Sequence, residues 1–157
     1  MSQLTHIDAN GNARMVEVSD KPVSHREATA DGFIAIGPEA LARIVERTAK
    51  KGDVLAVAQL AGIGGAKQTG TLIPLCHPIP LSGVSVELAV RNGGVYCTAT
   101  AKADWRTGVE MEALTAVSTA LLTVYDMLKA VDRSMTIGPI GLVNKSGGRS
   151  GPWEREG

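Results

Sequence analysis

An apolar helical repeat without charged side chains is the feature that most restricts how this chain can fold. Seven apolar residues between Met111 and Val131 recur every three or four positions, which predicts a helix from Glu110 to about Val131. The thirteen residues 113–125 carry no charge at all. A helix on the surface of a monomer shows charges on its outer side. We therefore expect a second subunit to help cover this helix, and we predict an oligomer.

The remaining chain carries shorter strand and helix patterns. Alternating apolar and polar residues predict strands, and apolar residues at helical spacing predict helices. In chain order, the expected elements are strands over 14–19 and 24–36, helices over 37–52 and 54–62, strands over 83–90 and 95–104, the long helix, and a strand over 136–143. Asp53 is placed to cap the second helix, and Asn92-Gly93 is typical of a hairpin turn. Such grouped hairpins and helices favour an α+β fold, with helices on one face of a mainly antiparallel sheet.

Length and composition predict one globular domain with two polar ends. We expect a mobile N-terminal arm over 1–13, a single α+β domain over 14–143 and a Gly- and Ser-rich tail over 144–157. The 16 basic and 16 acidic side chains cancel, which argues against a nucleic-acid partner. The two cysteines form no disulfide framework, and the chain shows neither an apolar secretion signal nor an uninterrupted apolar run of about 18 residues. We therefore expect a cytoplasmic protein without a membrane partner.

Charge returns to the long helix near its two ends. Asp126 and Lys129 are three positions apart and can touch, either as a simple salt bridge or as an acid/base pair tuned by partial burial. Both interpretations fit the spacing. Glu112 precedes Asp126 by fourteen positions, so at about 100° per residue the two carboxylates fall within about 40° of one another around the helix.

Several basic residues stand in or near glycine-rich stretches. Lys67 follows the sequence GIGGA, which lacks the residue order of a P-loop or of a dinucleotide fingerprint, so a loop that closes a helix is expected there. Lys145 and Arg149 flank two glycines in the tail, which fits either an anion-binding loop or a solvated end. Arg26 and Lys51 could be surface charges or could join such a site.

His77 lies in a stiff loop with prolines at 74, 78 and 80. It is either a packed histidine or a group held towards a ligand as a hydrogen-bond donor or general acid/base. The adjacent Cys76 and His77 cannot easily chelate one metal ion, and the sequence holds no second pair of this kind. We therefore expect no metal site.

Three long ungapped segments carry a resemblance to a known family. They are Leu72–Pro78 (LIPLCHP), Thr107–Thr115 (TGVEMEALT) and Thr123–Ala130 (TVYDMLKA). Shorter stretches at both ends, including 2–7 and 145–148, continue the match in the same order. Together they resemble the cyclic pyranopterin monophosphate synthase accessory-protein family of molybdenum cofactor (molybdopterin) biosynthesis.

This resemblance implies a ferredoxin-like α+β fold and a lyase reaction. In that reaction, (8S)-3',8-cyclo-7,8-dihydroguanosine 5'-triphosphate is converted to cyclic pyranopterin monophosphate, and pyrophosphate is released. The family assembles as a homohexamer, a trimer of dimers, with active sites at the dimer interface. That assembly agrees with a long helix covered by a second subunit. No resident cofactor is implied, although Mg²⁺ can accompany the triphosphate.

The resemblance also assigns roles to particular residues. It implies that Asp126 and Lys129 are catalytic. The residues that it implies for substrate binding are Leu75, Cys76, His77, Met111, Glu112, Arg26, Lys51, Lys67 and Lys145. Four cations from separate segments suit a triphosphate, and Asp126 and Lys129 can transfer protons if they are desolvated.

Two other classes of function remain as alternatives to this lyase. A non-catalytic regulator would bind nucleotide reversibly between subunits without changing it. A structural subunit would bind no small molecule. Incubation with the cyclic precursor separates the first alternative from an enzyme, and calorimetry with GTP analogues tests the second.

Overall fold

The computed structural model describes residues 5–157, which form five strands and three helices. The elements are β1 (Ser24–Ala35), α1 (Pro38–Val45), α2 (Val54–Leu72), β2 (Gly83–Arg91), β3 (Gly94–Trp105), α3 (Glu110–Leu128), β4 (Thr136–Ser146) and β5 (Trp153–Glu154). The strands form one sheet in the order β2-β3-β1-β4-β5, with every neighbouring pair antiparallel. Up to β4 the succession is βαββαβ, with α1 and α2 both between β1 and β2, as in ferredoxin-like folds. The predicted α+β fold is confirmed.

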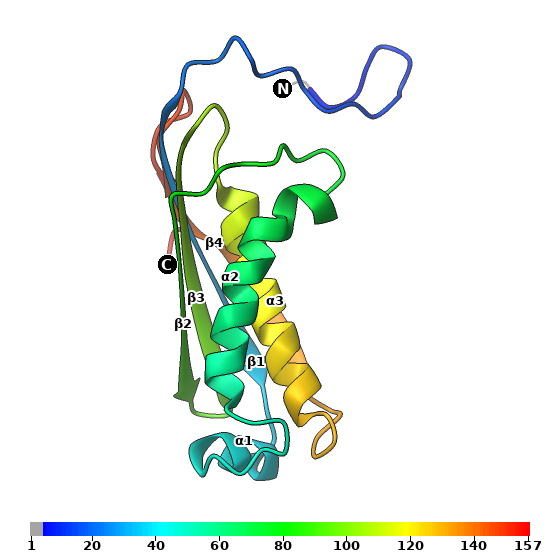
Figure 1. The fold of residues 1–157 in the computed structure, drawn as a ribbon, viewed down its shortest axis with the longest axis vertical. Coiled ribbons are helices and arrows are strands. Elements are labelled where there is room, and N and C mark those ends of the chain that lie inside the picture. The colour runs from blue at the N-terminus through cyan, green and yellow to red at the C-terminus, as the bar shows by residue number, and fades with distance from the viewer. Residues whose placement is uncertain (1–4) are drawn as a thin grey trace.

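Helices α2 and α3 lie beside each other on one face of the sheet (Figure 1). The sheet residues under them are mostly small: Ala28 and Ala30 of β1 and Ala99, Ala101 and Ala103 of β3 are all buried. Small side chains let α3 approach the sheet closely, and Val and Leu side chains of the helix fill the space between them. An aliphatic core of this kind needs few aromatic residues.

Helix α2 continues ten residues beyond its predicted end at Gly62, so Lys67 lies within a helix and not in a loop. The glycines that suggested a break allow α2 to pack closely on α3. A Cβ atom added at Gly65 would lie 2.7 Å from Thr119 Cβ, and one at Gly62 would lie 3.0 Å from the Ala116 carbonyl oxygen. The predicted cap is confirmed, because the Asp53 carboxylate accepts a hydrogen bond from the backbone N–H of Ala56.

The predicted strand over 14–19 is wrong. Its alternating residues belong to no strand of the sheet, and the side chain of Met15 is half exposed. The carbonyl of Val16 instead accepts a hydrogen bond from Nε2 of His77 at 2.7 Å. Alternation alone therefore did not make a strand, because the sheet offers this segment no neighbouring strand.

Other elements differ from the prediction in where they end. Helix α1 ends at Val45 and α3 at Leu128, both earlier than predicted, whereas β4 continues to Ser146. The tail also forms β5, which was not predicted and pairs with β4. The predicted hairpin of β2 and β3 is confirmed.

The chain itself covers only part of α3. Val117, Leu121 and Val124 are fully buried, but Leu122 is 59% exposed. By length and composition α3 could cross a membrane, yet half of that stretch is buried in this packing, as in the core helix of a globular domain. Coverage of the exposed side by a second subunit stays a prediction.

The predicted N-terminal arm starts with residues 1–4, which lie outside the described part of the chain, as do positions 2–4 of the first family motif. Within the described part, Ile7 and Ala13 form an isolated antiparallel bridge around a turn. Whether the arm is mobile stays a prediction.

Candidate active site

The predicted site residues gather mainly at the two ends of α3. At its N-terminal end lie the loop over 73–82 and the segment that begins at residue 5, and at its C-terminal end lie α1 and the connection from α1 to α2 (Figure 1). Fourteen positions separate Glu112 from Asp126, which corresponds to about 21 Å along the helix axis. One chain therefore holds two separate groups of site residues.

One cavity at the N-terminal end of α3 brings together five of the predicted substrate-binding residues. They are Leu75, Cys76 and His77 from the loop over 73–82, and Met111 and Glu112 from the first turn of α3. The cavity has a volume of about 210 Å³. Its loop is fixed by its prolines and by the hydrogen bond from the His77 ring to the Val16 carbonyl. The His77 ring makes this bond and the residue also lines the cavity, so the packed and the ligand-facing interpretations both stay open.

Glu112 is the buried carboxylic acid of this cavity, with 3% of its surface exposed. Burial, with a smaller contribution from the charge of Glu110, raises its pKa to about 7. Burial, with a contribution from the charge of Glu112, also raises the pKa of the Cys76 thiol. Near neutral pH, Glu112 is therefore able to take up or give a proton.

A larger cavity of about 500 Å³ adjoins the first and shares Thr107, Gly108 and Glu110 with it. The basic residues that line it are Lys21, Arg26, Arg106, Lys145 and Arg149, and the acidic one is Glu110. The Arg26 guanidinium is fixed by donation to the carbonyls of Trp105, at 3.2 Å, and of Arg106, at 3.0 Å. The resulting excess of positive charge suits an anion with several negative charges.

Three buried polar atoms on the wall of this cationic cavity have no hydrogen-bond partner among the described residues. They are Ser24 Oγ, Arg106 Nε and Thr107 Oγ1. Buried polar groups are nearly always hydrogen-bonded in folded proteins. The three residues line a cavity that suits an anion, but these atoms themselves are buried in the single chain. None of these three residues was among the predicted site residues.

The second group of site residues lies at the C-terminal end of α3, on a cavity of about 340 Å³. The Asp126 carboxylate binds two ammonium groups, with Oδ2 at 2.8 Å from Lys51 Nζ and Oδ1 at 2.9 Å from Lys129 Nζ. The hydrogen bond from Lys51, followed by that from Lys129, lowers the pKa of Asp126 to about 2. All three side chains are about half exposed, so this ion triplet is open to solvent in the single chain.

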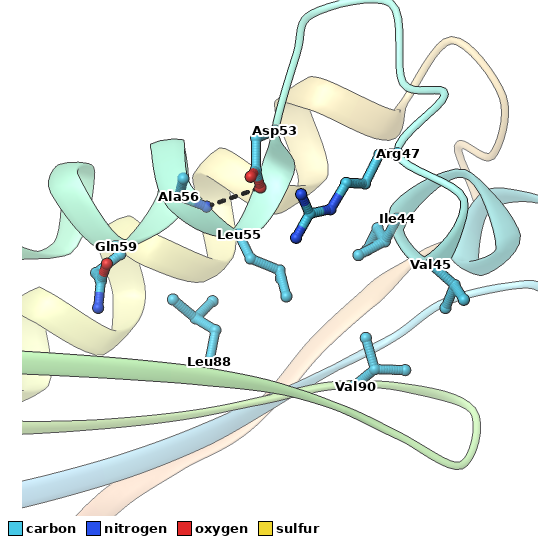
Figure 2. Close-up of a pocket in the computed structure, with 9 residues that line it drawn as sticks. All are labelled: Ile44, Val45, Arg47, Asp53, Leu55, Ala56, Gln59, Leu88 and Val90. Atoms are coloured by element: carbon cyan, nitrogen blue, oxygen red, sulfur yellow. Dashed lines mark hydrogen bonds between the residues drawn. The ribbon is translucent and has the colours of Figure 1, made fainter.

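Lys67 lies apart from both groups, on the exposed side of α2, and lines none of these three cavities. Another cavity, of about 510 Å³, lies between α1, the start of α2 and the end of β2 (Figure 2). Its lining is mainly aliphatic and includes Arg47 and Asp53 but none of the predicted site residues. Within residues 5–157, no three His, Cys, Asp or Glu side chains are placed to hold a metal ion.

Arg106 is the clearest omission from the sequence-based site. It directly precedes the motif Thr107–Thr115, so its neighbours were recognised while it was not. Its position in the cationic cavity depends on the antiparallel pairing of β1 with β3, which places Ser24 opposite Trp105. The signal that the sequence offered for Arg106 was its position directly before the motif Thr107–Thr115.

Comparison with known proteins assigns the chain to a family. The model of the MoaC family matches residues 15–148. A cyclic pyranopterin monophosphate synthase from Thermomicrobium roseum is 56% identical over 158 aligned positions, which cover 99% of this chain and 95% of that protein. A protein of the same name from Dinoroseobacter shibae is 58% identical, with 99% and 100% covered. On this similarity along nearly its whole length, the chain belongs to the MoaC family.

Proposed function

We propose that this protein is a cyclic pyranopterin monophosphate synthase. It converts (8S)-3',8-cyclo-7,8-dihydroguanosine 5'-triphosphate to cyclic pyranopterin monophosphate and releases pyrophosphate, in molybdenum cofactor biosynthesis. The names of its relatives support this activity. The observation in the structure that supports it most is the pair of adjoining cavities at the N-terminal end of α3, one cationic and one lined by Glu112 and His77.

The two cavities suit the two halves of this substrate. The triphosphate would lie in the cationic cavity against Arg26 and Lys145, a cavity that Arg106 and Thr107 also line. The guanine-derived ring would lie next to it, where Glu112 and His77 can bind polar ring edges. Cations at the phosphates stabilise the charge that develops as pyrophosphate leaves. Mg²⁺ can accompany the triphosphate as part of the substrate.

Asp126 and Lys129 of the neighbouring subunit would transfer protons, and Lys51 beside them would bind the substrate as a cation. In a single chain they lie about 21 Å along α3 from Glu112. A two-fold axis that pairs two copies of α3 in opposite directions would bring the C-terminal end of one helix to the N-terminal end of the other. The exposed stripe of α3 supports this pairing, because Met111 and Leu122 are apolar and lie on the same side as Asp126. A trimer of such dimers would give the homohexamer.

Coverage by a partner would also change the chemistry of Asp126. In the exposed triplet its carboxylate is held ionised, with a pKa of about 2. Removal of water raises the pKa of a carboxyl group and lowers that of an ammonium group. A partner subunit that excludes water would thus bring the Asp126 carboxyl group towards the range in which it exchanges a proton near neutral pH. Lys67 remains a proposed contact to substrate from the exposed side of α2.

The free thiols of Cys76 and Cys97 support a cytoplasmic location.

Incubation with the cyclic triphosphate, followed by chromatography, tests this function. The wild-type protein should form cyclic pyranopterin monophosphate and pyrophosphate. Asp126→Ala and Lys129→Ala should each lower kcat by at least about a hundredfold, as loss of a general acid or base does. Glu87→Ala, on an exposed position of β2, serves as the control and should keep full activity. Binding of the precursor without chemical change would identify a nucleotide-binding regulator instead.

A further inference from the structure

A bidentate ion pair connects the last residues of the chain to the middle of the sheet. Arg155 Nη1 lies 2.8 Å from Asp31 Oδ1, and Arg155 Nη2 lies 2.8 Å from Asp31 Oδ2. The side chain of Asp31, in β1, is only 14% exposed, and the Tyr96 hydroxyl donates a further hydrogen bond to Oδ2 at 2.7 Å. Two parallel bonds from a guanidinium to a carboxylate fix both distance and orientation.

This ion pair anchors the short strand β5. Strand β5 has two residues, and its pairing with β4 places Trp153 opposite Lys145. The backbone N–H of Arg155 also donates to the Val143 carbonyl at 2.8 Å. Two ladder positions are too few to stabilise an edge strand by themselves. To reach Asp31, the arginine passes Gly141 of β4, where an added Cβ atom would lie 3.4 Å from Arg155 Nη1.

The loop between β4 and β5 forms one wall of the cationic cavity. Gly148, Arg149 and Ser150 line that cavity together with Arg26 and Lys145. Gly148 lies directly against the Arg26 guanidinium, so closely that a Cβ atom there would overlap it, and Gly148 also has a left-handed φ of 80°. The Lys145 ammonium contacts the Ser150 hydroxyl. The position of this wall therefore depends on both strands that bound the loop.

We propose that Arg155 is a positioning residue for the cationic cavity. Through Asp31 it holds β5 in place, and β5 keeps the loop over 147–152 against Arg26, with its Ser150 hydroxyl at the Lys145 ammonium. The Arg155 guanidinium lies at Asp31, and neither of these residues is among the described residues that line the cavity. The proposal rests on the proposed function insofar as the cavity receives the triphosphate of the substrate.

Steady-state kinetics test this role with Arg155→Ala and Asp31→Asn. Because the proton-transferring groups are unaffected, KM for the cyclic triphosphate should rise about tenfold while kcat stays within about twofold of wild type. The double variant should be no worse than either single variant, since both remove the same anchor. Arg155→Lys keeps the charge but not the paired bonds and should fall between Arg155→Ala and wild type. Glu156→Ala, next in the tail and without a side-chain partner within residues 5–157, is the control and should match wild type.

Hydrogen exchange provides a second readout that needs no turnover. Backbone amides over 147–151 should exchange faster in Arg155→Ala, while those of α3 remain protected as in wild type. An unchanged KM, or equal exchange over 147–151 in variant and wild type, would overturn the proposal. If the wild-type protein forms no product, the proposed function fails, but hydrogen exchange still decides whether Arg155 holds this loop.

Discussion

Glu112 and Asp126 show how position on one helix determines the behaviour of a carboxyl group. Burial under the loop over 73–82 raises the pKa of Glu112 to about 7, whereas hydrogen bonds from Lys51 and Lys129 lower that of Asp126 to about 2. Helical spacing places them on nearly the same side, but the loop covers only the N-terminal end. The two carboxyl groups thus differ in pKa although they lie on nearly the same side of one helix.

The raised pKa of Glu112 predicts a pH-dependent stability. Its ordinary value is 4.5, and the value in the folded protein is about 7. Below about pH 4.5 both states bind the proton and burial has no ionic cost, whereas above about pH 7 the folded protein must bury the charge. The free energy of unfolding should therefore fall by about 3 kcal/mol from this residue as pH rises through that window.

Glu112→Gln removes this ionisable group. Urea unfolding at one protein concentration compares the free energy of unfolding of this variant with that of wild type. At pH 5 the variant should have a stability close to that of wild type, and at pH 8 it should be the more stable of the two by up to about 3 kcal/mol. Glu87→Gln, at an exposed position, should show no such change. Equal differences between Glu112→Gln and wild type at both pH values would contradict the buried acid.

At the scale of elements, close packing of α2 on α3 explains the glycines of α2. Gly65 faces Thr119, whereas Gly64 has no atom within 4 Å of the position that a Cβ would occupy. Gly64→Ala should raise the free energy of unfolding by about 0.5–1 kcal/mol, because alanine is the better helix former. Gly65→Ala should lower it by about 1–3 kcal/mol, because the methyl group overpacks the interface. Urea unfolding at one protein concentration checks both, and a stabilising Gly65→Ala would be incompatible with this packing.

The sequence predicted elements whose signals are local. Alternation around Asn92-Gly93 correctly predicted the hairpin, and the apolar repeat correctly predicted α3. The prediction from sequence failed where an element depends on segments that are distant along the chain. Glycines read as a break in α2 instead fit against α3, and β5 depends on Arg155 meeting Asp31, which lies 124 positions earlier.

The site residues were likewise predicted where the signal is local and missed where it depends on distant segments. Motifs in the sequence named the loop residues around His77 and the acidic start of α3, and the structure gathers both on one cavity. Arg106 was missed because its role depends on the pairing of β1 with β3. The position of Lys67 also required the structure, since only the continuation of α2 sets it on an exposed helix face.

At the scale of the whole molecule, the separation of the two groups along α3 is the main feature to explain. One chain has a cationic cavity and Glu112 at one end, and the Asp126 triplet at the other. We propose that the cationic cavity and Glu112 at one end bind the substrate and that Asp126 and Lys129 at the other end transfer protons, so neither end of one chain would form a complete site. A dimer with antiparallel α3 helices would supply both at two equivalent sites, and each site would draw on two chains.

Subunit complementation tests this shared site most directly. Asp126→Ala impairs the group at one end of α3 and His77→Ala impairs the other, so each variant alone should be inactive. After unfolding and joint refolding in equal amounts, about half of the dimers should be mixed and each should hold one intact site, which restores about a quarter of wild-type activity. Light scattering should give a mass well above the 16.4 kDa of one chain, and differently tagged chains should confirm mixing. Mixed oligomers without recovered activity would contradict a site built from two subunits.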